Sequence, residues 1–90
     1  MIQVIKFGAQ WCGPCRVIAP AIKKLQETYN IDGSSVNITE VDIDQDPESA
    51  SQYSIRNIPT LVFIKDGEVN QKKTGVLSES QIDEIINSLK

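Results

Sequence analysis

The sequence contains no histidine and only two cysteines, which restricts the metal sites that it can build. A structural zinc site takes about four ligands, mostly cysteine thiolates and histidine nitrogens. Cys12 and Cys15 supply only two, so a complete zinc site made of cysteine and histidine within one chain is excluded. Help from carboxylates, or a site shared between two chains, stays open, but we expect no metal.

The sequence also lacks a long hydrophobic run and a cluster of basic residues. Its longest apolar run, residues 61–64, is far too short to cross a bilayer. The net charge is −3 and the lysines and arginines are scattered, so no basic surface is predicted that would bind a phosphate backbone. We therefore expect neither a membrane nor a nucleic acid as a partner.

The first residues carry no mark of export. No basic segment precedes the apolar residues 2–7, and no small-residue cleavage site follows them, so we expect a cytoplasmic protein. Disulfides are seldom structural in a reducing cytosol, and a bridge between Cys12 and Cys15 would close only a very small loop. The two cysteines are therefore predicted to be reactive or metal-binding, with a role as small buried apolar residues as the remaining alternative.

The length of 90 residues predicts a single domain over 1–90. Hydrophobic periodicity, turn residues and capping residues together predict seven elements. In chain order they are a strand over 2–7, a helix from Cys15 to Tyr29 kinked at Pro20, a strand over 36–43, a short helix from Pro47 to near Tyr53 after an Asp46 N-cap, a strand over 60–65, a strand over 68–74 after an Asp66–Gly67 turn, and a helix that follows a capping box over 78–81.

This order, βαβαββα, predicts an α/β fold. The first two strands should be parallel and the last two a hairpin, which gives a mixed four-stranded sheet with helices on both faces. The last strand is polar and carries Lys72 and Lys73, as suits a sheet edge that must not pair with other chains.

The residues Trp11-Cys12-Gly13-Pro14-Cys15 lie between the first strand and the first helix. Free N–H groups and the dipole at a helix N-terminus stabilise a thiolate, so the pKa of Cys12 should fall below the usual thiol value of about 8.5. We predict that Cys12 is the exposed nucleophile and that the more buried Cys15 resolves the mixed disulfide. Gly13 and Pro14 set the helix start, and Trp11 should cover the site with an apolar surface.

With this motif the chain resembles the thioredoxin family. The likeness continues, in the correct order, through residues 18–20, 42–47, 55–60, 65–68 and Gly75. It implies the thioredoxin fold in a minimal form, and a protein dithiol–disulfide oxidoreductase that takes part in electron transport and cell redox homeostasis. It further implies no bound cofactor beyond the redox-active disulfide, and recharging by an NADPH-dependent thioredoxin reductase.

The resemblance also assigns a substrate groove. It implies a cis peptide bond between Ile58 and Pro59, facing the cysteines, whereas the residues by themselves favour a trans proline that starts a strand. The groove would be formed by Trp11, Gly13, Pro14, Ile58, Pro59 and the segment around Gly75 and Val76.

The chain departs from the family pattern beside the cysteines. Lys6 stands where the family has an acid, Glu40 where it has a lysine, and Gly8 where it has a tryptophan. We hypothesise that Glu40, through Lys6 or a water, takes the proton of the resolving thiol, and that the Lys6 cation lowers the thiol pKa. The alternatives are a plain ion pair between Lys6 and Glu40, or a Lys6 side chain that extends to solvent.

A further departure is that the first strand lies almost at Met1, without the strand and helix that usually precede it in the family. One sheet face should then be thinly covered, and we expect a monomer of reduced stability. Two other functions remain open: a glutaredoxin-like protein recharged by glutathione, and a binding subunit that does not use its cysteines.

Overall fold

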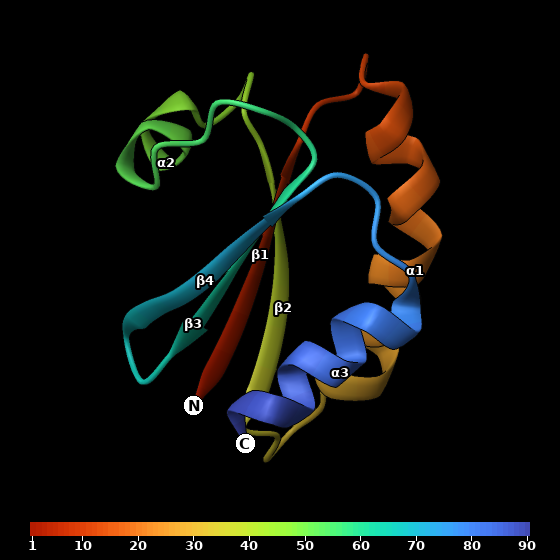
Figure 1. The fold of residues 1–90 in the computed structure, drawn as a ribbon, viewed down its shortest axis with the longest axis vertical. Helices are drawn as coiled ribbons and strands as arrows, with labels where there is room; N and C mark the ends of the chain where they lie inside the picture. The colour runs from red at the N-terminus through yellow and green to blue at the C-terminus, as the bar shows by residue number, and fades with distance from the viewer.

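A central sheet with helices on both sides makes up the computed structural model, which describes all residues 1–90 (Figure 1). The elements follow in the predicted order and are β1 (Ile2–Gly8), α1 (Gly13–Tyr29), β2 (Val36–Asp42), α2 (Pro47–Gln52), β3 (Thr60–Lys65), β4 (Glu68–Thr74) and α3 (Glu79–Leu89).

The sheet is mixed, as predicted, with the strand order β2-β1-β3-β4. β1 runs parallel to β2 and antiparallel to β3, and β3 pairs antiparallel with β4. The turn between β3 and β4 places Asp66 at φ 51° and Gly67 at φ 85°, the left-handed conformations that a two-residue hairpin of this type requires. The polar strand β4 lies at a sheet edge and is largely exposed.

The two faces of the sheet are covered unequally. α1 and α3 pack together over one face, where twelve buried residues form the main core. On the other face a smaller cluster of Phe7, Val62 and Ile64 is covered by half-buried residues that include Ala50 and Tyr53 of the α2 region. Alternation along β1 explains the division, because Ile2 and Val4 point to the first face and Phe7 to the second.

The predicted boundaries need small corrections around the cysteine motif. α1 begins at Gly13 and not at Cys15, because Cys12 itself is the N-cap and its sulfur accepts the backbone N–H of Cys15. β1 runs one residue further, to Gly8, and β2 stops one residue earlier, at Asp42. Pro20 lies inside α1, which continues through it as one helix.

Candidate functional site

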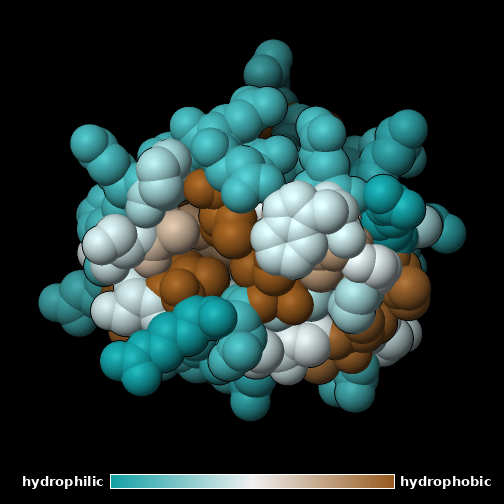
Figure 2. Space-filling view, turned by 90° about the horizontal axis from the view of Figure 1, so that it is seen from above, coloured by the Kyte–Doolittle hydropathy of each residue, from teal (hydrophilic) through white to brown (hydrophobic).

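The cysteine motif lies where β1 ends and α1 begins. Figure 2 looks onto this end of the molecule and shows apolar surface about the middle of the face, ringed by hydrophilic side chains. β1 ends where β2, its parallel neighbour, also ends, and Pro14 in the first turn gives α1 a residue that needs no N–H partner. The site is therefore placed by the end of a strand and the start of a helix.

Cys12 and Cys15 form a disulfide with their Cα atoms 5.3 Å apart. The Cys15 N–H donates to Cys12 Sγ at 3.2 Å, so the first turn of α1 directs a backbone donor at the sulfur of Cys12. The same donor would stabilise a thiolate there once the disulfide opens.

The prediction that Cys12 is exposed was wrong. Its accessible fraction is 5 %, against 2 % for Cys15, so both cysteines are buried. Ala9 is buried with them, and Ile43 and Ile58 pack against the three. Ile43 follows β2 and Ile58 lies in the loop before β3, which is why the position of Cys12 at the outer end of the motif did not reveal its burial.

The loop before β3 faces the cysteines. The Ile58–Pro59 peptide bond is cis, as the resemblance implies, and the Ile58 carbonyl lies 3.9 Å from Cys12 Sγ. The Gly75 N–H donates to the Pro59 carbonyl at 2.9 Å, and Gly75 has φ +100°, a conformation that glycine tolerates best. The predicted groove residues of the two loops are thus held side by side.

The remaining predicted groove residues form the exposed rim of the site. Gly13 and Pro14 are exposed, and Val76 and Trp11 are 49 % and 66 % exposed. The Trp11 indole N–H donates to the Asp44 carboxylate at 2.7 Å, which fixes one edge of the ring and leaves apolar surface open.

Two functional neighbours, Ile43 and Asp44, were missed by the sequence analysis. Both follow β2, the parallel neighbour of β1. Parallel strands present their carboxyl ends at the same sheet edge, so the residues after β2 had to lie near those after β1. That topological rule was available from the predicted order of elements.

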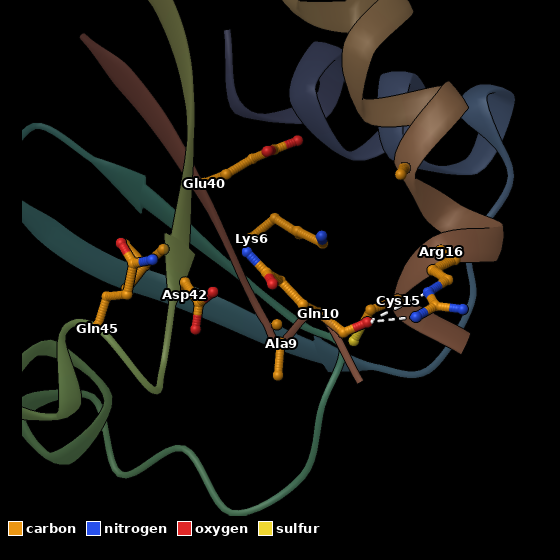
Figure 3. A pocket seen from close by; sticks show the side chains of 11 residues that line it. Lys6, Ala9, Gln10, Cys15, Arg16, Glu40, Asp42 and Gln45 are labelled. Atoms are coloured by element: carbon orange, nitrogen blue, oxygen red, sulfur yellow. Dashed lines mark hydrogen bonds between the residues drawn. The ribbon is translucent and has the colours of Figure 1, made fainter. Parts of the chain in front are cut away.

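A cavity of about 630 Å³ lies behind the cysteines, between β1, β2 and α1. Figure 3 shows that Lys6 and Glu40 extend into it from adjacent strands, toward α1, with Cys15 and Arg16 on the helix side. Lys6 and Glu40 are register partners, but the ion pair considered as an alternative does not form, because no contact between them meets a salt-bridge distance. Their side chains lie beside each other without meeting.

No group of three or more histidine, cysteine, aspartate and glutamate side chains is arranged to hold a metal ion. No helix combines the length and the apolar character that a membrane span requires.

Comparison with known proteins finds relatives of this chain in both sequence and structure. The family model described as Thioredoxin matches residues 1–88. The thioredoxin of Listeria monocytogenes is 40 % identical over 81 residues, which are 90 % of this chain and 76 % of that protein. The thioredoxin of Bacillus subtilis is 37 % identical over 86 residues, 96 % of this chain and 80 % of that protein. The crystal structure of Fasciola hepatica thioredoxin superposes with a TM-score of 0.86 at 40 % identity, covering 99 % of this chain and 81 % of that one.

Proposed function

This chain belongs to the thioredoxin family, and we propose that Cys12 attacks substrate disulfides while Cys15 resolves the mixed disulfide. Like its relatives the protein is a protein dithiol–disulfide oxidoreductase. The observation that carries the assignment of roles is the backbone N–H of Cys15, which points at Cys12 Sγ and at no other sulfur. The thiolate that forms most readily is then on Cys12.

The reaction runs in two exchanges. The Cys12 thiolate attacks one sulfur of the substrate disulfide, a new S–S bond forms, and the other substrate sulfur leaves with the electron pair and takes up a proton. Cys15 then loses its proton to solvent and attacks Cys12 Sγ. The Cys12–Cys15 bond forms, the bond to the substrate breaks, and the second substrate thiol is released. Two electrons pass from the dithiol to the substrate.

The substrate chain is proposed to lie along the cis-proline loop. The Ile58 carbonyl beside Cys12 and the adjoining Gly75–Val76 segment offer backbone groups to which a peptide can add like a strand. Trp11, Gly13 and Pro14 form the exposed rim on the other side of the cysteines. The small apolar rim accepts many sequences, which suits a general reductase.

In the cell, the proposed place of this protein is the cytoplasm, as an electron carrier between an NADPH-dependent thioredoxin reductase and disulfide-bearing proteins. The dithiol itself carries the electrons, so no further cofactor is required. Recharging by glutathione alone is the competing scheme, and a purified system separates the two. Turnover that requires the reductase and NADPH supports the proposal, and equal turnover with glutathione alone contradicts it.

The roles of the cysteines are tested with two serine variants. Cys12→Ser should abolish reduction of a protein disulfide, because the attacking thiolate is gone. Cys15→Ser should accumulate a mixed disulfide with substrate, visible as a mass adduct, because nothing resolves it. An adduct on Cys15 in the Cys12→Ser variant, with none in the Cys15→Ser variant, would reverse the assignment. A cellular function that survives exchange of both cysteines for serine would support the alternative of a binding subunit that does not use its cysteines.

A further inference from the structure

The rows of side chains that β1 and β2 point at α1 change character along the sheet. On β1, Ile2 and Val4 belong to the main core, and the next residue on that face is Lys6. On β2, Val36 and Ile38 belong to the same core, and Glu40 follows. The charged end of both rows lines the cavity beside the start of α1, where Lys6 is half-buried and Glu40 is exposed.

Gly8 is the last residue of the β1 row, and the space that it leaves joins Lys6 to Cys15. A Cβ atom at Gly8 would lie 3.2 Å from Cys15 Sγ and 3.2 Å from both Cε and Nζ of Lys6. The ammonium and the sulfur are therefore separated by no more than twice that distance, across a gap that only a glycine leaves open. Gly8 is needed here for room and not for a special backbone conformation, since its φ is not positive.

The two sulfurs differ in what would stabilise a negative charge on them. Cys12 Sγ receives a backbone N–H, whereas Cys15 Sγ has no hydrogen-bond partner. The positive group that approaches Cys15 from the sheet is the Lys6 ammonium. No carboxylate lies within ion-pair distance of it, since the only ion pair of the molecule joins the Met1 amino group to Asp66.

The other charged groups facing this cavity are few. Arg16 of α1 donates through its guanidinium to the Gln10 carbonyl, at 2.8 and 3.2 Å, and so is held at the rim. Glu40 and Asp42 of β2 line the far wall. On β3 the residue opposite Lys6 is the apolar Leu61.

We propose that the Lys6 ammonium, admitted by Gly8, stabilises the thiolate of Cys15 when the disulfide opens, so that the cation and not Glu40 prepares the resolving sulfur. The proton of Cys15 leaves to solvent, and no side chain needs to accept it. Because the disulfide is uncharged and the thiolate is not, Lys6 favours the reduced form and makes the pair a stronger oxidant. The proposal rests on the disulfide-exchange function and specifies how this site departs from a carboxylate-assisted one.

The first test measures the pKa of Cys15 in the Cys12→Ser background, where Cys15 is the only thiol, from the ultraviolet absorbance of the thiolate. Lys6→Met should raise the pKa of Cys15 by about one unit, because a nearby cation is lost and the hydrocarbon stem is kept. Lys6→Arg should preserve the value. Lys65→Met is the matched control, since it removes the same charge from the far end of β3 and should leave Cys15 unchanged.

The second test measures the equilibrium of the intact cysteine pair against a dithiothreitol buffer, at a pH above the Cys15 pKa measured in the first test. There Cys15 is a thiolate in the reduced form, so Lys6→Met should shift the equilibrium about tenfold toward the disulfide, which is about 30 mV for two electrons. Gly8→Ala should shift it in the same direction, because the added methyl displaces the amine from the sulfur. Glu40→Gln should not shift it toward the disulfide.

Equal behaviour of Lys6→Met and Lys65→Met would overturn the proposal, as would an effect confined to Glu40→Gln. Either result can occur in a fully active disulfide reductase, so failure here is distinct from failure of the proposed function. Disulfide reduction that survives in the Cys12→Ser variant would instead contradict the proposed function.

Discussion

Tyr29 shows, at the scale of single residues, how one polar contact links two helices. Its hydroxyl, at the end of α1, donates to the Asp83 carboxylate of α3, and the Lys90 ammonium lies 5.2 Å from the ring centre. The hydrogen bond to Asp83, then burial, then the negative charge of Asp83 raise the pKa of Tyr29 to about 12. The neutral hydroxyl is therefore favoured more strongly in the folded protein than in the unfolded chain.

A raised folded pKa makes the contribution of this contact dependent on pH. It is fully present below the unfolded pKa of tyrosine, near 10, and is lost as the pH rises toward about 12. Tyr29→Phe should destabilise the protein by about 0.5–1 kcal/mol at neutral pH, the lower part of the range for a hydrogen bond, because the pair is partly exposed. Urea unfolding of both proteins at several pH values checks this. A difference that persists unchanged well above pH 10 would contradict it.

Cys12 and Lys6 show the opposite case, in which a residue's role depends on distant neighbours. The motif placed the two cysteines at a helix start correctly, as the disulfide and the N-cap confirm. The burial of Cys12, however, comes from Ile43 and Ile58, which arrive from other parts of the chain. The approach of Lys6 to Cys15 depends on a cavity that forms only when α1 lies over the sheet.

At the scale of the element, α3 shows how local sequence fixes a helix start. Ser78 accepts the Gln81 N–H at 3.1 Å, and the Gln81 side chain accepts the Ser78 N–H at 2.9 Å. Behind this capping box, Ile82, Ile86 and Leu89 enter the main core. Both features were readable from sequence because each depends on residues only three or four apart.

Removal of the cap is expected to weaken the whole protein, because α3 covers one face of the sheet. Ser78→Ala should cost about 1 kcal/mol, the typical loss for an N-cap serine. Ser80→Ala, two residues later on the exposed side of the same turn, should cost much less. The denaturant concentrations at the unfolding midpoints of the two variants measure this difference. Equal midpoints would show that the cap does not stabilise α3.

At the scale of the whole molecule, the less covered face of the sheet still buries its apolar cluster. The radius of gyration is 12.2 Å, which is the value of about 12 Å expected for a single domain of this length. Half-buried residues of β1, β2 and the α2 region close over Phe7, Val62 and Ile64. The exposed large apolar side chains are scattered along the chain: Met1, Trp11, Val17, Ile31, Val69 and Val76.

A stable dimer interface buries about 1,000 Å² or more in total, and these six side chains come from separate places in the sequence. We therefore expect a monomer at micromolar concentration. Sedimentation velocity in the oxidised and reduced states measures this directly. A dimer that persists on dilution would mean that the thinly covered face is an interface, and that the protein's stability depends on its concentration.

The sequence by itself determined the order and type of the elements, the Asp66–Gly67 turn, the capping box and the place of the cysteine pair. These follow from contacts between residues a few positions apart, through periodicity, φ preference and capping. The tertiary structure decided the burial of Cys12, the bond from Trp11 to Asp44, and the failure of Lys6 and Glu40 to pair. These features depend on the directions of side chains and on the space beside Gly8. Both are defined only when α1 and β2 are packed on β1.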